Sequence, residues 1–366
     1  MSHILNLRHC PKVISQHGFI IMLIFFIIIL CIKIQYSSRP LKKIDSSILF
    51  TPVKNVLFSA NVLDTFITLD HGVSHVNAIQ RYNKTGKENA LLQKIYPQLA
   101  DLPVASTGLL LDPEIVMLRK PDAVLTWQGR DEILKDLGLP GIITLQMSRS
   151  NQIRQHVSLW LLLGNLTGQK KRATTLLNYY QKQRLSLIEQ TRNQPSSRIL
   201  LLIGGFGKGY WLGPTTHYLN ERFTSLGATI SNKNMHTGNS DLEYIMQLDP
   251  DIIFLSESGT GDQMSPQQLY DLPEWQSLRA IKMRRVYKMP SLPSFTIPVE
   301  DPIRLQWIAE ILYPNDIKKQ TREVIKHTIL MAYAYPISDT EIDNLLNLAE
   351  NEYSANYSRF YCHQGE

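Results

Sequence analysis

The chain has 366 residues, of which 43% are hydrophobic and 19% charged, so it is long and apolar enough for two globular domains. Its 38 Lys and Arg against 32 Asp and Glu give a formal net charge of +6, but the basic residues are scattered and form no stripe interleaved with aromatic side chains, which argues against nucleic-acid binding. The three cysteines exclude a disulfide framework and a cysteine metal cluster.

The N-terminus carries an almost uninterrupted apolar run, Gly18 to Ile34, after a basic stretch without acidic residues. Residues 1–36 are therefore predicted to be a signal sequence or a membrane anchor, with the rest of the chain exported to the periplasm or another extracytoplasmic space. Cys31 suggests lipidation, but Leu30 precedes it where a lipoprotein signal has a small residue. Residues 37–53 are polar and aperiodic, which predicts a tether.

Strand and helix patterns alternate over residues 54–168, which predicts a first α/β lobe with a parallel sheet covered on both faces. Apolar and β-branched residues predict a strand over Val62 to Leu69, ended by Asp70-His71-Gly72, and a helix over Val73 to Gln80. Further elements are predicted as helices at 113–119, 131–137 and 151–166 and as strands at 123–127 and 141–145.

The stretch Gln169 to Asn193 is predicted to be one long helix, because it lacks Pro and Gly and its apolar residues share one face. At 1.5 Å per residue it would span roughly 37 Å. Taken alone it is typical of an amphipathic surface helix. The predicted face consists of Ala173, Leu176, Leu177, Tyr180, Leu187 and Ile188.

The same alternation restarts over residues 194–314, which predicts a second α/β lobe. Its predicted strands lie at 198–203, 252–255 and 286–289, and its predicted helices at 216–226 and 240–248, with short elements at 269–272 and 275. In the extension 315–366, one helix is predicted to end near Ala334 and another to begin at Ser338-x-x-Glu341 and end near Tyr353, packing against a lobe. The last residues are expected to be disordered.

The two predicted lobes share a sequence pattern. Glu114 is followed seven residues later by Pro121-Asp122 and a hydrophobic strand, and Glu243 is followed seven residues later by Pro250-Asp251 and another. Two such units on either side of a long helix indicate duplicated α/β lobes, and the helix is then interpreted as a rigid spine between them.

In this arrangement the chain resembles the class III substrate-binding proteins of ABC importers, which take up cobalamin, ferric siderophores and haem. The resemblance covers about Asp64 to Pro314. It implies two Rossmann-like lobes with parallel sheets, joined by one long α-helix, with a ligand cleft between them and little closure. It also implies capture of a metal complex, with an iron chelate as the leading candidate, and delivery to a membrane permease dimer. Besides the repeated units and the long helix, the resemblance rests on Trp275, Leu278, Val286-Tyr287, Pro290, Glu300-Asp-Pro302, Trp307 and Ile311-Leu-Tyr-Pro314.

Glu114 and Glu243 match the family position at which each lobe carries one exposed carboxylate for docking onto arginines of the permease. Two carboxylates spaced across a rigid body can set orientation on a basic partner. The alternative is purely structural, because Asp112-Pro113-Glu114 is a good helix start and Ser240-x-x-Glu243 fits a capping box.

Ligands of open parallel sheets bind beyond the carboxyl ends of the strands, which here indicates four loops. Tryptophan and tyrosine offer flat apolar faces and arginine a fork of donors, a set that suits an anionic organic chelate. The structural alternatives are that Trp127 is core and that Gly204-Gly205 is a simple turn. The candidate ligand-binding residues are Asp70, His71, Trp127, Arg130, Phe206, Tyr210, Trp211, Ser256 and Glu257.

No resident cofactor or catalytic group is expected. His71, His217 and His236 match no metal-site spacing, and phosphate-loop, nucleophile-elbow and zinc-protease motifs are missing from the sequence. The leading hypothesis is a non-enzymatic binding protein. An enzyme that acts on a metal chelate and a tethered sensor or scaffold without transport remain as alternatives, and siderophore, haem, cobalamin, free metal and oxyanion all remain open as ligands.

Overall fold

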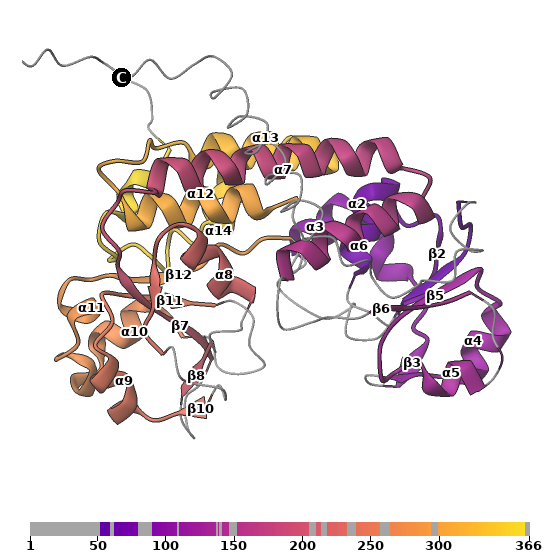
Figure 1. The fold of residues 1–366 in the computed structure, drawn as a ribbon, viewed down its shortest axis with the longest axis horizontal. Helices are drawn as coiled ribbons and strands as arrows, with labels where there is room; N and C mark the ends of the chain where they lie inside the picture. The colour runs from indigo at the N-terminus through magenta and orange to yellow at the C-terminus, as the bar shows by residue number, and fades with distance from the viewer. Residues whose placement is uncertain are drawn as a thin grey trace, which may run out of the picture. The chain divides into compact units, whose positions relative to one another are not determined.

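The computed structural model describes residues 52–58, 62–79, 90–107, 110–136, 138, 141–145, 152–204, 210–213, 218–232, 239–256, 264–293 and 299–362 (Figure 1). The predicted anchor Gly18 to Ile34 and nearly all of the predicted tether lie outside these residues. Among the helices that are described, none combines the length and the apolarity needed to span a bilayer.

Within the described residues, the first sheet has four parallel strands in the order β2-β1-β5-β6. We call the part of the molecule built on it the N-lobe. Because its strands are parallel, their carboxyl ends share one edge of the sheet, and β5 and β6 extend in register to Trp127 and Leu145 at that edge. The strands are β1 (Val56–Phe58), β2 (Val76–Ile79), β5 (Ala123–Trp127) and β6 (Ile142–Leu145).

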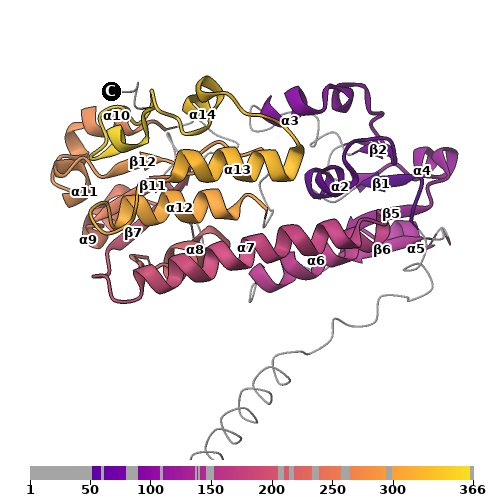
Figure 2. The same ribbon diagram turned by 90° about the horizontal axis from the view of Figure 1, so that it is seen from above.

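Helices cover both faces of this sheet (Figure 2). Leu57 belongs to a core cluster with Val116 of α4 and Leu134 of α5. The next residue, Phe58, points to the opposite face, where its ring lies 5.0 Å from that of Phe66 on α2, and α2 in turn contacts α6. The remaining N-lobe elements are α2 (Leu63–Asp70), α3 (Ala90–Ile95), the 3-10 helix η4 (Pro97–Asp101), β3 (Ser106–Thr107), β4 (Leu110–Leu111), α4 (Pro113–Arg119), α5 (Glu132–Asp136) and α6 (Gln152–Leu166).

Two predicted elements at the start of the N-lobe are wrong. Residues 62–69, predicted as a strand, form helix α2, and residues 73–80, predicted as a helix, contain strand β2. Six of the eight residues of α2 are buried, so its sequence lacks the polar face that marks an amphipathic helix. Its β-branched Thr68 is accommodated because the hydroxyl donates to the carbonyl oxygen of Asp64 at 2.7 Å.

The second sheet is mixed. In the described part of the chain its order is β10-β8-β7-β11-β12, with β9 paired to β7. β9, β7, β11 and β12 are parallel, as predicted for this lobe, whereas β8 pairs antiparallel with β7 and β10 pairs antiparallel with β8. We call the part built on this sheet the C-lobe. Its strands are β7 (Arg198–Gly204), β8 (Tyr210–Leu212), β9 (Thr229–Ile230), β10 (Asn239–Ser240), β11 (Ile252–Leu255) and β12 (Val286–Lys288).

The helices of the C-lobe follow the predicted order. Predicted helix 240–248 corresponds to α9, and predicted helix 216–226 corresponds to α8. Residues 216 and 217 of the latter prediction lie outside the described residues. The C-lobe helices are α8 (Tyr218–Ser225), α9 (Leu242–Leu248), α10 (Pro266–Asp271), the 3-10 helix η5 (Pro273–Trp275) and α11 (Arg279–Lys282).

The predicted long helix is confirmed as α7, Lys170–Thr191, which spans 22 residues. It packs against α6 and against α12, so it contacts helices that precede and follow it in the chain. Five of the six residues predicted on its inner face are buried, and Ile188 is half-buried. Its length corresponds to about 33 Å, the size of a small domain.

After the C-lobe the chain forms a helical extension, as predicted. It follows α12 (Asp301–Leu312), the last helix of the C-lobe, and its elements are α13 (Thr321–Tyr333), α14 (Asp339–Leu345) and the 3-10 helix η6 (Tyr357–Phe360). The capping box of Ser338 and Glu341 is confirmed. Helix α14 ends at Leu345, eight residues before the predicted Tyr353, and the chain continues in turns. The predicted disorder of the last residues concerns 363–366, outside the described residues.

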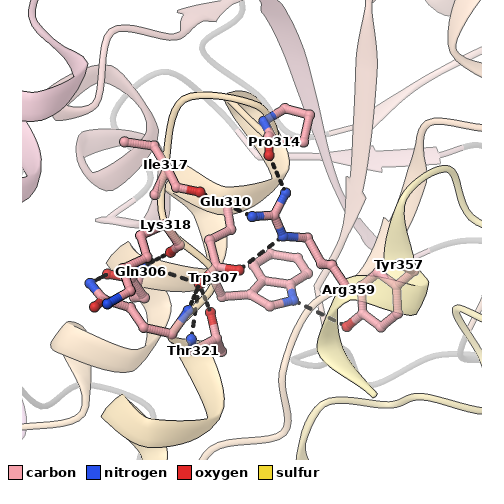
Figure 3. Close-up of polar contacts among 10 residues, drawn as sticks. Gln306, Trp307, Glu310, Pro314, Ile317, Lys318, Thr321, Tyr357 and Arg359 are labelled. Carbon is pink, nitrogen blue, oxygen red and sulfur yellow. Dashed lines mark hydrogen bonds and ion pairs between the residues drawn. The ribbon is translucent and has the colours of Figure 1, made fainter. Parts of the chain in front are cut away.

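The end of the chain is anchored on α12 by a buried carboxylate (Figure 3). Glu310 is fully buried and pairs with Arg359 at 3.0 Å, while its other oxygen accepts hydrogen bonds from the backbone and hydroxyl of Thr321. Arg359 also donates to the carbonyl oxygens of Pro314 and Ile317 at 2.7 and 3.0 Å. A buried charge is tolerated when it is paired and hydrogen-bonded in this way.

The extension also covers the outer edge of β12. Asn351 accepts a hydrogen bond from the backbone nitrogen of Lys288 at 2.7 Å and donates to its carbonyl oxygen at 3.0 Å. Ser354 donates to the carbonyl oxygen of Val286 at 2.6 Å, and the hydroxyl of Tyr270 accepts from the backbone nitrogen of Val286 at 3.0 Å. Side chains thus replace the neighbouring strand that an edge strand lacks.

Finally, the extension contacts the N-lobe. Lys94 on α3 pairs with Glu341 on α14 at 2.5 Å. Arg172 on α7 donates both to the carbonyl oxygen of Thr68 on α2, at 3.2 Å, and to that of Ala332 on α13, at 2.6 Å. The extension therefore packs against both lobes, whereas the sequence predicts packing against one.

Candidate functional site

A tight turn follows β5 at the carboxyl edge of the N-lobe sheet. The backbone nitrogen of Arg130 donates to the carbonyl oxygen of Trp127 at 3.0 Å, and Gly129 has φ of 83°, which fits the third position of a type II turn. The backbone nitrogen of Gln128 donates to the carbonyl oxygen of Leu145 at 2.9 Å and extends the pairing with β6. The structure therefore places two predicted ligand-binding residues, Trp127 and Arg130, at the two ends of one turn.

The turn is held by Asp131, which is not among the site residues predicted from the sequence. Its carboxylate is buried, accepts from the backbone nitrogen of Gly129 at 3.0 Å and from the hydroxyl of Thr144 at 2.7 Å, and pairs with Lys135. Burial raises the pKa of the Asp131 carboxyl, but the hydrogen bonds outweigh burial and lower the pKa to about 2. An aspartate just before a short helix is usually only a cap, so the sequence carries no clear signal for this role.

The two cationic side chains near this turn, Lys135 and Arg130, differ in whether they have a partner. Lys135 is neutralised by Asp131, whereas the guanidinium of the half-buried Arg130 has no hydrogen-bond or ion-pair partner within the described residues. Arginine presents a rigid fork of donors that suits carboxylate, phosphate and similar anions. The carboxyl edge of the N-lobe therefore carries, at the two ends of one turn, a tryptophan and an arginine whose guanidinium has no partner within the described residues.

The C-lobe residues predicted to bind ligand lie in different surroundings, and not all of them are described. Tyr210 packs edge-on against Trp275 at 5.1 Å and accepts a hydrogen bond from its indole nitrogen at 3.2 Å, so part of its surface belongs to the C-lobe core. Ser256 directly follows β11, is buried, and its backbone nitrogen donates to the carbonyl oxygen of Leu202 at 2.8 Å. For Trp211 only the backbone in β8 is described, and Phe206 and Glu257 lie outside the described residues.

Asp70 and His71 lie at the opposite edge of the N-lobe sheet from Trp127. They end helix α2, and the backbone nitrogen of Val56, the first residue of β1, donates to the carbonyl oxygen of His75 at 2.8 Å. The interpretation that they follow the carboxyl end of a strand is wrong, because the segment before them is a helix. Asp70 instead pairs with His75 at 2.8 Å, and burial raises the pKa of the Asp70 carboxyl.

The helices that carry the two predicted docking glutamates have the same local structure. Both α4 and α9 have seven residues, begin after an aspartate N-cap and end in a left-handed residue before Pro-Asp. Glu114 and Glu243 are exposed in the first turn of each. The predicted capping box of Ser240 and Glu243 is wrong, because Asp241 accepts from the backbone nitrogen of Tyr244 at 2.8 Å and Ser240 belongs to β10.

The aspartate of each Pro-Asp pair ties its strand to the neighbouring one. Asp122 accepts from the backbone nitrogen of Lys54 at 2.9 Å, next to the start of β1. Asp251 accepts from the backbone nitrogen of Arg198 at 2.8 Å, at the start of β7. The repeated sequence pattern therefore corresponds to a repeated three-dimensional unit, one in each lobe.

No cluster of three or more His, Cys, Asp or Glu suited to a metal ion occurs in the part of the chain that the structure describes. His71 is an exposed residue in the left-handed conformation, with φ of 59°. His217 and His236 lie outside that part.

Comparison with known proteins places the chain in a family. The model of the periplasmic binding protein family matches residues 59–293, well over half of the chain. No curated protein matches the sequence.

Similar solved structures include a periplasmic solute-binding protein from Veillonella parvula, with 21% identity and a TM-score of 0.73 over 83% of this chain and 94% of that one. The CeuE protein of Helicobacter pylori, in complex with Ni-His, has 17% identity and a TM-score of 0.64 over 81% and 95%. The molybdate-bound MolA of Haemophilus influenzae has 12% identity and a TM-score of 0.66 over 78% and 94%. The chain belongs to the periplasmic binding protein family, the solute-binding proteins of ABC transporters, in the class whose two α/β lobes are joined by one long helix.

Proposed function

We propose that the protein captures an anionic metal complex, of the iron-chelate kind, between its two lobes and delivers it to the permease dimer of an ABC importer. The observation that carries this proposal is the turn Trp127–Arg130, at the carboxyl edge of a parallel sheet, which has an aromatic residue at one end and, at the other, a guanidinium without a partner among the described residues. Parallel sheets bind ligands at this edge. No bond of the ligand is made or broken in this function.

The chemistry of related proteins is compatible with this ligand class. The similar structures from Helicobacter pylori and Haemophilus influenzae hold nickel with histidine and molybdate, respectively. Both ligands contain a metal, and molybdate is an oxyanion. In this chain the ring of Trp127 would contact the apolar part of a chelate while Arg130 would bind its negative charge.

Delivery would use the exposed carboxylates on the repeated units. Glu114 and Glu243 occupy equivalent positions on helices of equal length, one in each lobe. Because α7 is an uninterrupted helix packed along its length, it would keep these carboxylates at a nearly constant separation. The N-terminal segment 1–36 would hold the protein at the membrane that contains the permease.

Ligand binding can be tested with the full chain purified in detergent. Tryptophan fluorescence would be followed while ferric tris-catecholate, a ferric trihydroxamate, haem, cobalamin, nickel with histidine, and molybdate are titrated in turn. We expect micromolar or tighter binding of an anionic member, and about tenfold weaker binding after Arg130→Met. If every probe fails to bind at micromolar concentration, the transport proposal is contradicted.

Docking can be tested separately from binding. Reversing both charges with Glu114→Lys and Glu243→Lys should abolish uptake through the neighbouring permease while ligand affinity stays unchanged. Glu189→Lys is the matched control, because Glu189 is an exposed carboxylate on α7, away from both repeated units. An equal loss of ligand affinity in the double variant would show that the carboxylates do not act in docking.

A further inference from the structure

We propose that Asp131 is a positioning residue for ligand recognition: its carboxylate fixes the turn Trp127–Arg130 and holds Lys135, so that Arg130 stays available to an anionic ligand. This inference rests on the proposed function and assigns a second layer of residues to the same site. Asp131 itself is buried and would not touch the ligand.

The first argument is geometric. The Oδ1 atom of Asp131 accepts from the backbone nitrogen of Gly129, inside the turn, and its Oδ2 atom accepts from the hydroxyl of Thr144, on the neighbouring strand β6. The turn is therefore attached to the sheet both through the backbone of Gln128 and through the carboxylate of Asp131. A binding group is most effective when such supporting contacts hold it in its bound position.

The second argument concerns charge. Arg130 and Lys135 both lie close to Asp131 in sequence, and an uncommitted carboxylate there would attract the guanidinium of Arg130. Both oxygens of Asp131 are instead engaged by Gly129, Thr144 and Lys135. The low pKa of Asp131, about 2, keeps this carboxylate ionised near neutral pH.

A purely structural role would have a different signature. If Asp131 only began helix α5, its substitution would lower stability and leave the affinity of the folded protein unchanged. The sheet offers a matched pair of residues to separate these cases. Thr126 on β5 lies opposite Thr144 on β6, and both are threonines of the same parallel pair. The hydroxyl of Thr144 binds Asp131, whereas the buried hydroxyl of Thr126 has no hydrogen-bond partner among the described residues.

The test compares Thr144→Val with Thr126→Val in the full chain, using as probe whichever anionic complex of the panel binds the unmodified protein. Valine keeps the β-branched shape and removes only the hydroxyl. We expect Thr144→Val to weaken probe binding about threefold to tenfold and Thr126→Val to change it less than about twofold. Thr144→Ser, which keeps the hydroxyl, should restore most of the affinity.

Asp131→Asn completes the test. An amide keeps the size of the side chain but places a donor against Lys135 or Thr144, so we expect about tenfold or greater loss of affinity with the stoichiometry of binding unchanged. Equal affinities of the Thr144→Val and Thr126→Val proteins would overturn the inference even if Asp131→Asn does not fold. Failure of the unmodified protein to bind any probe would instead contradict the proposed function.

Discussion

The two lobes contain the same helix-Pro-Asp-strand unit and complete it differently. In the N-lobe, the strand of this unit is followed by the turn Trp127–Arg130. The guanidinium of Arg130 has no partner within the described residues and is therefore available to bind another molecule. In the C-lobe, Arg222 on α8 is buried and bound through two hydrogen bonds to Asp301 on α12, at 2.7 and 2.8 Å. The repeat thus sets the frame of each lobe, and the residues around it determine whether a charge serves stability or remains available to a partner.

This difference assigns separate tasks to the two lobes. The long extension packs its buried polar groups onto the C-lobe, at β12 and α12. The two predicted ligand-binding residues that the structure brings into one turn, Trp127 and Arg130, lie in the N-lobe. We therefore expect substitutions in the C-lobe network to affect mainly folding and substitutions in the N-lobe turn to affect mainly binding.

The largest effect on stability is expected for Arg222→Ala. This change removes the bidentate partner of the buried Asp301 carboxylate and leaves it only Arg304, 3.6 Å away, and removing one partner of a buried ion pair costs about 3–5 kcal/mol. Urea denaturation followed by circular dichroism would measure the free energy of unfolding. Arg279→Ala is the control, because Arg279 pairs with Asp251 but its side chain is 55% exposed, so about 0.5 kcal/mol is expected. Equal losses of stability in the two variants would show that burial does not determine how much these ion pairs contribute.

A smaller loss is expected for Asn351→Ala, about 2–3 kcal/mol, because both backbone groups of Lys288 lose their side-chain partner at the edge of β12. The same denaturation experiment applies. Hydrogen exchange at the amide of Lys288 should also accelerate, while exchange in β1 of the N-lobe stays unchanged. A uniform acceleration in both lobes would show that the extension stabilises the whole body and does not act mainly on the C-lobe.

The contact between the N-lobe and the extension should depend on pH. Burial raises the pKa of Glu341, but hydrogen bonds from Lys94, Tyr335 and Ser338 outweigh burial and lower the pKa to about 2. A folded-state pKa below the unfolded value gives stability that is present above about pH 4.5 and is lost as the pH falls toward 2.

Glu341→Gln tests this dependence, because glutamine can keep the capping box of α14 while removing the charge. We expect a loss of about 2 kcal/mol at pH 6 that shrinks toward zero as the pH approaches 2, measured by urea denaturation across this range. Glu323→Gln, at an exposed position of α13, should show no such trend. A loss that does not vary with pH would mean that the charge of Glu341 is not responsible.

The smallest effect is expected for Leu118→Gln, which gives α4 the residue that α9 carries at the equivalent position, Gln247. The side chain of Leu118 is 80% exposed, so the free energy of unfolding should change by less than about 0.5 kcal/mol. Thermal denaturation would measure it. A larger loss would show that the outward faces of the two repeated helices are not structurally equivalent.

The sequence predicts elements well where their chemistry is local. The boundaries of α4, β5 and β11 agree with prediction to the residue, because a Pro-Asp pair, a helix start and a continuous apolar run mark their ends. It fails at α2, whose burial on most sides removes the polar face by which a helix is recognised. The antiparallel strands β8 and β10 are too short to give an alternating pattern.

The candidate site is predictable to a similar extent. The type of residue and its place after a strand indicate Trp127 and Arg130 correctly as neighbours at the carboxyl edge, while their roles in binding stay predictions. The same rule misplaces Asp70 and His71, because it depends on the erroneous strand before them. Asp131 gives no signal, since its partners Gly129 and Thr144 are joined to it only by the way β6 lies beside β5.

The contacts that complete the C-lobe join parts of the chain that are far apart in sequence. Asn351, at the outer edge of β12, lies 63 residues after Lys288, and Arg359 lies 49 residues after Glu310, whose charge it neutralises. The entropy of closing loops of this length opposes such contacts until the segments on both sides are in place. We therefore expect the edge of β12 to gain protection from hydrogen exchange only after the extension has docked.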